Sequence, residues 1–323
     1  MPEIIIFIVA LLAAIRGADW VGKASISFAK RLGVSQFIIG VTFVSIATTL
    51  PELAVAFISG TINHNPPFGL GNVLGSPIIN LGLILGSFFI ISKHQPSLGY
   101  YSRAINIFII VSAILLIASF FRPIGGLLSI FLILFGVAFI VLEFLLSQRT
   151  KSLIDGVENR FDKFISFFHL AGNRDVILEF IFGTALLIFG CKFLVDSGVA
   201  IANNVGVNSF FISATVLAAG TSLPELVTMI TSVIKKRDGI SIGNLVGASV
   251  IDATIGVGLA TIAKPAALTT VFSILFFVTM IGLGIVCLIA LWRRIKIEVI
   301  GGILVATALA FVILLSLLEF TSR

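Results

Sequence analysis

The chain has 323 residues, of which 58% are hydrophobic and only 11% are charged. A water-soluble domain carries charges on about a quarter of its residues, so a soluble enzyme, a disordered chain and a secreted disulfide scaffold are excluded. The mean hydropathy of +1.19 and the repeated apolar runs indicate a polytopic helical membrane protein. The net charge of +6 does not indicate nucleic acid, because the cations lie mostly in short connections between apolar runs, where they determine topology.

Apolar segments of transmembrane length alternate with short polar connections along the whole chain. Dividing the sequence at charges, Pro and Gly gives ten candidate spans and predicts an all-α polytopic membrane protein. The candidates are residues 4–29, 37–59, 68–91, 104–121, 124–146, 176–202, 210–234, 240–263, 267–292 and 299–318. Cys191 and Cys287 lie inside these runs and are expected to be buried small side chains rather than disulfide or metal ligands.

Lys and Arg residues are distributed unequally between alternate connections. Fifteen lie in the connections of one side, and only Arg122, Lys264 and Arg323 lie on the other. Cytoplasmic loops carry the excess of Lys and Arg, so we expect a multi-pass protein of the cell membrane with both termini outside. The long central loop, residues 147–175, is then cytoplasmic. Its FISFF stretch fits an amphipathic segment on the membrane surface as well as a solvated linker.

Two blocks of sequence occur twice, once on each side of the central loop. GVSQFIIGVTFVSIATTLPEL (33–53) returns as GVNSFFISATVLAAGTSLPEL (206–226), offset by 173 residues, and GNVLGSPIINLGLILG (71–86) returns as GNLVGASVIDATIGVG (243–258), offset by 172. Each half contains five spans, an odd number, so the second half should enter the membrane inverted. This predicts a first five-helix repeat (1–147), a cytoplasmic linker (148–175) and a second, inverted five-helix repeat (176–323), with a substrate site near the membrane midplane.

Each copy of the first block places a proline and a carboxylate deep in a span, as Pro51-Glu52 and Pro224-Glu225. Proline removes an amide donor and frees backbone carbonyls one turn back. The carbonyls concerned include those of Ser45, Ala47 and Ala218. An ionised Glu at mid-membrane is costly unless it is compensated, and neither block contains a basic residue. A bound cation is the natural compensation, and a protonated Glu that stabilises helix packing is the alternative.

The second block adds Asn80 and its counterpart Asp252, each after a Gly-Asn-x-x-Gly stretch whose small residues allow helices to approach closely. The asparagines of these stretches, Asn72 and Asn244, either line an access path or hydrogen-bond a neighbouring helix. Three carboxylates, one amide, four hydroxyls and free carbonyls suit Ca²⁺, which takes about 6 to 8 oxygen ligands. Zinc and copper sites would need His or Cys, and the blocks contain neither.

Two further pairs of charges lie inside spans. Asp19 with Lys23, and Lys192 with Asp196, are opposite charges four residues apart, at repeat-related positions with the signs exchanged. We expect each pair to neutralise itself or to extend toward a membrane interface. A substrate vestibule is the alternative interpretation.

At these residues the sequence resembles the cation/calcium exchanger superfamily, most closely its prokaryotic sodium/calcium exchanger branch. The resemblance covers nearly the whole chain and rests on the two TxLPEL copies, the paired Gly-Asn-x-x-Gly blocks and the ten spans. It implies a secondary active antiporter, not an enzyme, that moves Ca²⁺ in exchange for Na⁺ by alternating access and needs no cofactor. The first helix of each half would slide across a fixed core. The implied partners are these ions and the lipid bilayer, with no nucleic acid and with a monomer as the expected state.

The resemblance also implies the ion ligands. A central Ca²⁺ is held by Glu52 and Glu225 with the oxygens of Thr48 and Thr221. Flanking Na⁺ sites use Thr49, Ser222, Asn80, Asp252 and small hydroxyl residues such as Ser76. Family members commonly read Gly-Ser-Asn in both second blocks, whereas here Pro77 follows Ser76, and Ala248 stands at the position that repeats Ser76. This departure weakens one flanking Na⁺ site.

Exchange of Ca²⁺ for H⁺ through the same acids is therefore the alternative coupling. Proton/calcium exchangers usually carry a Gly-Asn-x-x-Glu block, which is missing here, so Na⁺ is favoured. An intramembrane hydrolase would need a nucleophile with a base, or a metal with an activated water, and the blocks contain no His or Cys for this. A channel fits less well, because inverted halves around one buried site suit alternating access better than a continuous pore.

Overall fold

In the computed structural model the described residues are 2–31, 44–93, 96, 100–121, 123–152, 174–234, 238–291 and 295–321. Within them, ten helical stretches are long and apolar enough to cross a membrane, which confirms the predicted all-α fold with ten transmembrane helices. Their outward faces carry apolar side chains, and Phe121 and Leu127 are 80% and 85% exposed. Lipid tails are the solvent for such faces, so this exposure is not a cost in a membrane.

The first five spans are α1 (Pro2–Arg31), α3 (Ser45–Phe57) with η2 (Ile58–Ile62), α4 (Pro66–Ile78) with η3 (Ile79–Ile84) and α5 (Leu85–Ser92), α6 (Tyr100–Phe121) and α7 (Leu127–Ser152). The second five are α9 (Arg174–Val205), α10 (Ser209–Ile212) with η5 (Ser213–Leu217), α11 (Ala218–Thr221) and α12 (Leu223–Ile234), α13 (Asp238–Ile251) with η6 (Asp252–Gly256) and α14 (Val257–Thr261), α15 (Thr270–Ile289) and α16 (Ile297–Thr321). The segments named η are single π-helical turns, so spans two, three, seven and eight are not regular α-helices.

Two predicted boundaries are wrong. The fifth span is predicted to begin at residue 124, but Ile124 precedes α7 and exchanges two backbone hydrogen bonds of 2.8 Å with Ala266. The flanking Pro123 and the positive φ of Gly126 keep this stretch out of a helix. The central loop is predicted to span 147–175, but α7 continues to Ser152 and α9 begins at Arg174. The FISFF stretch and residues 37–43 of the predicted second span lie outside the described residues.

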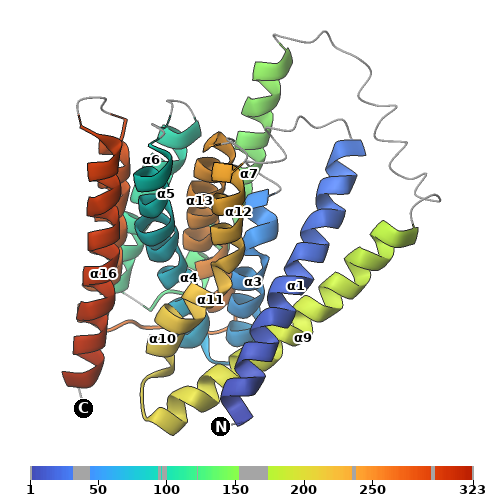
Figure 1. Cartoon of the computed structure of the whole chain (residues 1–323). Helices are drawn as coiled ribbons and strands as arrows, with labels where there is room; N and C mark the ends of the chain where they lie inside the picture. Colours follow the sequence, from blue (N-terminus) through green and yellow to red (C-terminus); the bar gives the residue numbers. More distant parts are fainter. Residues whose placement is uncertain are drawn as a thin grey trace.

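Helices α1 and α9 pack against each other on the outside of the helix bundle (Figure 1). Their backbones approach closely at glycines: a methyl group on Gly17 would lie 2.7 Å from the carbonyl oxygen of Gly183, and one on Gly190 would lie 2.7 Å from the amide nitrogen of Ala14. Small residues at such crossings let transmembrane helices gain contact along their whole length. α1 rises from the lower end of the bundle, whereas α9 descends toward it, and α16 also ends there (Figure 1).

The remaining spans surround α4 and α13, which are the most enclosed helices. Nearly every side chain of α4 and every residue from Ser241 to Thr254 is buried. Aromatic rings fix the outer helices around them: Phe276 of α15 meets the ring of Phe210 at 5.2 Å and that of Phe311 at 4.8 Å, both edge to face. The polar residues of both repeated blocks therefore lie inside the bundle, screened from lipid.

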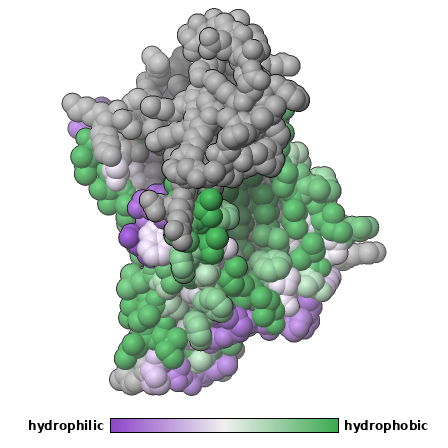
Figure 2. All heavy atoms as spheres, turned by 90° about the vertical axis from the view of Figure 1, so that its right-hand side faces the viewer, coloured by the Kyte–Doolittle hydropathy of each residue, from purple (hydrophilic) through white to green (hydrophobic). Residues whose placement is uncertain are grey.

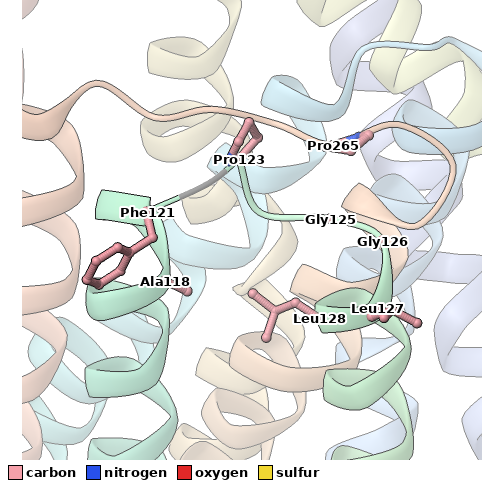
Figure 3. A pocket seen from close by; sticks show the side chains of 8 residues that line it. All are labelled: Ala118, Phe121, Pro123, Gly125, Gly126, Leu127, Leu128 and Pro265. Carbon is pink, nitrogen blue, oxygen red and sulfur yellow. The ribbon is translucent and has the colours of Figure 1, made fainter.

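The surface of the molecule agrees with insertion in a bilayer. Seen from the side of α1 and α9, it is mostly hydrophobic, and hydrophilic residues gather at the lower end (Figure 2). At one end of the bundle the Ile124–Ala266 bridge joins a connection of the first half to one of the second. Beside it, Pro123, Gly125 and Pro265 line a shallow apolar cavity of about 510 Å³ (Figure 3). No predicted ion ligand lines this cavity.

Candidate ion-binding site

Four residues predicted to bind ions lie fully buried on four different segments. Glu52 lies in α3, Glu225 in the first turn of α12, Asn80 in η3, and Asp252 begins η6. None of the four side chains is exposed. The charges of Glu225 and Asp252 both act on Glu52, so the acids of the two halves share one interior region. The bundle thus brings together residues that lie up to 200 positions apart in the sequence.

The carboxylates of this region have no hydrogen-bond partner. Both oxygens of Glu52, of Glu225 and of Asp252 are buried and unpaired within the part of the chain that the structure describes. The amide of Asn80 and the hydroxyls of Ser76 and Ser222 are also buried and have no partner among the described residues. Buried polar groups are almost always hydrogen-bonded, so a cluster of unpaired oxygens indicates that something other than protein completes the site.

The acids do not form a compact three-carboxylate cage. Among the described residues, no three His, Cys, Asp or Glu side chains are grouped to hold one metal ion. A cation held here would therefore bind with hydroxyl, amide and carbonyl oxygens beside the carboxylates. Such mixed oxygen sets are the ligands that hard cations prefer.

The threonines of the TxLPEL copies are placed beside the glutamates of the opposite half. Thr221 of α11 lies near the carboxyl group of Glu52, and Thr48 of α3 lies near that of Glu225, but neither hydroxyl is at hydrogen-bond distance from a carboxylate oxygen. The preceding turns supply carbonyls. That of Ser45 accepts the hydroxyl of Thr49 at 2.5 Å, and that of Ala218 accepts the amide of Ser222 at 3.1 Å. A second hydroxyl also lies 3.4 Å from each of these carbonyls, that of Thr48 from Ser45 and that of Thr221 from Ala218, so neither carbonyl is fully released from its own span.

The two prolines have different local effects. α3 continues through Pro51, whereas span seven breaks at Ser222, which has φ −79° and ψ 4° between α11 and α12. Pro224 is the second residue of α12, where proline is well tolerated. The break also places Glu225 in the first turn of a helix, where the helix dipole favours negative charge. The sequence shows both prolines but not this difference.

The π-helical turns coincide with the polar residues of the second block. Asn80 is the second residue of η3, and its counterpart Asp252 is the first residue of η6. A π-helical turn widens the helix and loosens its backbone hydrogen bonds, and such turns occur frequently at functional sites. Apart from the repetition of the block, no sequence pattern predicts these turns.

Asn72 and Asn244 hydrogen-bond across the two halves. The hydroxyl of Thr48 donates to Oδ1 of Asn244 at 3.2 Å, and the hydroxyl of Thr221 donates to Oδ1 of Asn72 at 3.1 Å. The two bonds join repeat-related residues reciprocally. Of the two predicted roles, hydrogen bonding to a neighbouring helix is therefore confirmed. Their equal positions in the two blocks were the signal that sequence analysis had for them.

The second departure from the family pattern is visible in α13. Ala248 is fully buried and has a methyl group where its counterpart Ser76 has a hydroxyl without a partner in the described part of the chain. The next residue, Ser249, donates its hydroxyl to the Leu245 carbonyl of its own helix at 2.8 Å. At this pair of repeat-related positions the first half therefore has a hydroxyl and the second half has none.

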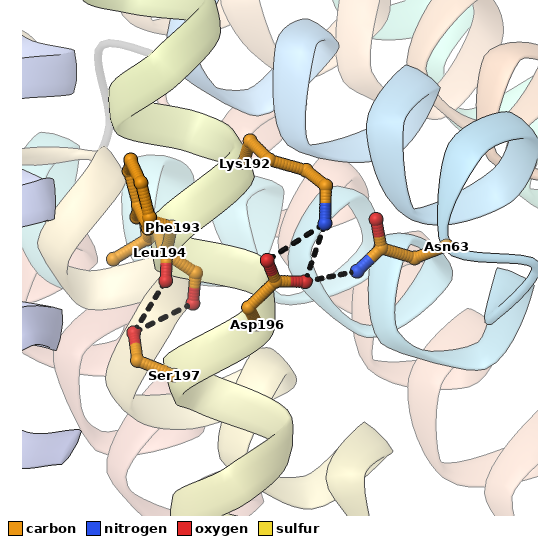
Figure 4. Close-up of polar contacts among 6 residues, drawn as sticks. All are labelled: Asn63, Lys192, Phe193, Leu194, Asp196 and Ser197. Atoms are coloured by element: carbon orange, nitrogen blue, oxygen red, sulfur yellow. Dashed lines mark hydrogen bonds and ion pairs between the residues drawn. The ribbon is translucent and has the colours of Figure 1, made fainter.

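The other intramembrane charges form ion pairs, as predicted. Lys23 lies 2.8 Å from Asp19, and Lys192 lies 2.7 Å from Asp196, all of them partly exposed. Asp196 also accepts a hydrogen bond of 2.5 Å from Nδ2 of Asn63 at the end of η2 (Figure 4). This contact connects α9 to a helix of the central bundle.

The family model described as sodium/calcium exchanger protein matches residues 3–154 and 176–319. The chain belongs to this family. It is a multi-pass membrane transporter of the exchanger type and not an enzyme, and the resemblance seen in the repeated blocks is confirmed. The two matched segments lie on either side of residues 155–175.

Individual relatives of this exchanger match over nearly their whole length. The sodium/calcium exchanger MaX1 of Methanosarcina acetivorans is 26% identical, over 96% of this chain and 97% of its own. The inner membrane protein YrbG of Escherichia coli is 26% identical, over 90% and 88% of the two chains. Among solved structures, the sodium-calcium exchanger NCX_Mj soaked with Na⁺ and Sr²⁺ has a TM-score of 0.63 and 21% identity, covering 95% of this chain and 96% of its own. At that identity the match establishes the fold.

Proposed function

We propose that the protein is a secondary active antiporter that moves Ca²⁺ across the membrane in exchange for Na⁺ by alternating access. The observation that supports this best is the pair of buried glutamates, one from each half, whose four carboxylate oxygens have no partner among the described residues. Leaving ionised carboxylates unpaired in a membrane interior costs several kcal/mol or more. A transported cation removes that cost each time it binds.

The roles of the ligands follow from charge and position. Glu52 and Glu225 together supply two negative charges, which match one Ca²⁺, and the hydroxyls of Thr48 and Thr221 lie beside them. The flanking Na⁺ positions use Thr49, Ser222, Asn80, Asp252 and Ser76 with the carbonyls of Ser45, Ala47 and Ala218. Na⁺ and Ca²⁺ are both hard cations that bind oxygen, so one region serves both in turn.

The arrangement of helices supports alternating access. The α1–α9 pair lies on the outside of the bundle, while the unpaired acids lie in α3, α12 and η6 inside it (Figure 1). Movement of this pair across a stationary core would open the region to one side of the membrane and then to the other. We also propose two inverted five-helix repeats, 1–147 and 176–323, joined by a cytoplasmic linker, with both termini outside. The opposite courses of α1 and α9 support this inversion.

Exchange of Ca²⁺ for H⁺ is the second candidate. It is favoured by one observation, the absence of a hydroxyl at the fully buried Ala248, which leaves one Na⁺ position short of a ligand. The three unpaired acids would then carry protons instead. The same residues serve both mechanisms, and the coupling ion alone distinguishes them.

The test is uptake of ⁴⁵Ca²⁺ into proteoliposomes under imposed gradients. We expect an outward Na⁺ gradient to drive uptake and a pH gradient alone to have no effect. Uptake driven by the pH gradient alone, without an effect of Na⁺, would establish H⁺ coupling. Failure of both gradients to move Ca²⁺ in folded protein would contradict both mechanisms. Glu298→Gln is the matched control, because it removes a carboxylate that lies 3.8 Å from Lys93 at the molecular surface, and its uptake should equal that of the wild type.

A further inference from the structure

Two asparagines of the repeated blocks have a role that the proposed ligand set does not include. Asn72 of α4 and Asn244 of α13 are fully buried, and Oδ1 of each accepts a threonine hydroxyl from the opposite half. Those threonines are Thr221 and Thr48, which lie beside Glu52 and Glu225 respectively. The structure therefore contains two chains of contacts with the same order: asparagine, threonine, glutamate.

The acceptor of each threonine hydroxyl determines where its proton points. A threonine in a helix ordinarily donates to a carbonyl three or four residues earlier. Here the asparagine oxygen is nearer in both copies: 3.1 Å against 3.2 Å to the Leu217 carbonyl for Thr221, and 3.2 Å against 3.4 Å to the Ser45 carbonyl for Thr48. A hydroxyl has one proton and two lone pairs. A proton held by the asparagine cannot point at the adjacent carboxylate.

In both asparagines, the orientation that turns the amide oxygen to the threonine leaves the amide nitrogen without an acceptor. Nδ2 of Asn72 and Nδ2 of Asn244 are both buried without a hydrogen-bond partner among the described residues. A buried amide hydrogen without an acceptor is unfavourable. The same unfavourable arrangement occurs at both repeat-related positions, and in both the amide oxygen faces the threonine.

We propose that Asn72 and Asn244 are positioning residues for the transported cation. Each accepts the proton of the threonine hydroxyl across the interface between the halves, and so turns a lone pair of that hydroxyl toward the cation beside the glutamate. Without the asparagine, the hydroxyl would donate to the carboxylate and compete with the cation for the same oxygen. This proposal rests on the proposed function, because it requires a cation at the glutamates.

The test is a double-mutant cycle on purified full-length protein, read as the ⁴⁵Ca²⁺ concentration for half-maximal binding in detergent. Asn72→Leu keeps a similar volume but removes the acceptor, and it should weaken Ca²⁺ binding about tenfold, as loss of groups that orient metal ligands usually does. In a Thr221→Val background the same change should have an effect of less than about twofold, because the residue acts through that hydroxyl.

The matched control exchanges the partners. In a Thr48→Val background, Asn72→Leu should still have its full tenfold effect, because Thr48 bonds to Asn244 instead. Asn244→Leu gives the reciprocal cycle. It should have little effect on Ca²⁺ binding in a Thr48→Val background and should weaken binding about tenfold in a Thr221→Val background. A purely structural role in helix packing would weaken binding equally in both backgrounds. Such equal effects, or no loss in the single variants, would overturn the inference.

Folding and function are separated within the same experiment. Thermal unfolding of each variant shows whether it is folded, and alanine replaces leucine in the cycle wherever the leucine variant is not. Wild-type protein that binds no Ca²⁺ would overturn the proposed function, and this inference with it. Wild-type protein that binds Ca²⁺ and shows equal effects in both backgrounds would overturn the inference alone.

Discussion

Each of the two buried glutamates favours Ca²⁺ binding but makes the folded, ion-free protein less stable. Glu52→Gln or Glu225→Gln removes a charge without much change of volume, so Ca²⁺ affinity should fall by about 100-fold, because ligand charge determines affinity over orders of magnitude. The unpaired carboxylate is unfavourable in the ion-free protein, so thermal unfolding in Ca²⁺-free buffer should not occur at a lower temperature. Wild-type uptake of ⁴⁵Ca²⁺ by both variants would refute the assignment.

The missing hydroxyl at Ala248 can be restored. Ala248→Ser adds one oxygen at the position that repeats Ser76, and it should lower the Na⁺ concentration for half-maximal exchange by about 2- to 10-fold, the range expected for one hydrogen-bonding or ligand group. Ser249→Ala is the control, because that hydroxyl donates to the Leu245 carbonyl of its own helix, and it should leave the Na⁺ dependence unchanged. A Na⁺ dependence that is equal in all three proteins would show that position 248 lies outside the Na⁺ site.

At this scale the sequence was most informative where it repeats. Duplication of TxLPEL identified Glu52 and Glu225, and duplication of the second block identified Asn80 and Asp252, and all four are buried together. The partners of Asn72 could not be predicted, because its bond to Thr221 joins residues 149 positions apart in different spans. Only the packing of α4 against α11 determines that contact.

The contact between Asn63 and Asp196 connects the α1–α9 pair to the core. In the proposed cycle α9 moves relative to η2, so this hydrogen bond of 2.5 Å has to break. Asn63→Ala should change the maximal exchange rate by about 2- to 10-fold, as loss of a hydrogen bond to a charged group can, while half-maximal ⁴⁵Ca²⁺ binding in detergent stays the same.

Ser197→Ala provides the matched control for this contact. Ser197 directly follows Asp196, but its hydroxyl donates within α9, to the carbonyls of Phe193 and Leu194 at 2.6 and 3.3 Å (Figure 4). It should exchange at the wild-type rate. A change of Ca²⁺ affinity in Asn63→Ala, or equal rates in all three proteins, would contradict a role in the movement of α9.

Close packing of α1 on α9 depends on glycine. Gly190→Ala places a methyl group 2.7 Å from the Ala14 amide nitrogen, so the helices must separate. We expect a loss of about 1–3 kcal/mol of stability, as for overpacked interiors, seen as a lower unfolding temperature in detergent. Gly302→Ala in α16 meets no atom within 4 Å, and it should be neutral or slightly stabilising. Equal unfolding temperatures would mean that the two helices do not need this contact.

The apolar runs predict that each transmembrane helix is present, but they do not predict the residues at which it begins and ends. The ten spans were predicted because each carries enough apolar residues to cross the bilayer. The apolar side chain of Ile124 favours a place inside a span, although its backbone pairs with Ala266. α7 was ended too early because its last turn is polar, and a helix continues in water when its backbone bonds are satisfied.

Topology is a property of the whole molecule that one experiment can check. α1 begins and α16 ends at the same end of the bundle (Figure 1), and the asymmetry of Lys and Arg predicts that this end lies outside the cell. A protease added to right-side-out vesicles should therefore remove tags fused to either terminus. Protection of both tags would reverse the predicted orientation, and removal of only one would contradict the shared end.

The proposed inversion of the halves is inferred from the odd number of spans in each repeat. The reciprocal Thr48–Asn244 and Thr221–Asn72 bonds are what two equivalent halves related by an approximate two-fold axis would form. The coupling ion could not be derived in this way, because Na⁺ and H⁺ use the same acids and differ only in the last few ligands. Sequence and fold therefore identify the class of transporter, whereas the coupling ion depends on a few ligands and has to be measured.

The rate at which the two buried cysteines are alkylated can report the movement of α9. Cys191 of α9 is fully buried, with its sulfur 3.7 Å from the carbonyl of Pro51 next to Glu52, whereas Cys287 is fully buried in α15. A membrane-permeant maleimide can alkylate Cys191 only in moments when α9 leaves α3, so its labelling rate in unmodified protein should depend on whether Na⁺ or Ca²⁺ is present. Cys287 should stay unlabelled throughout, and alkylation of Cys191 at one rate in every ionic condition would mean that α9 does not move with ion occupancy.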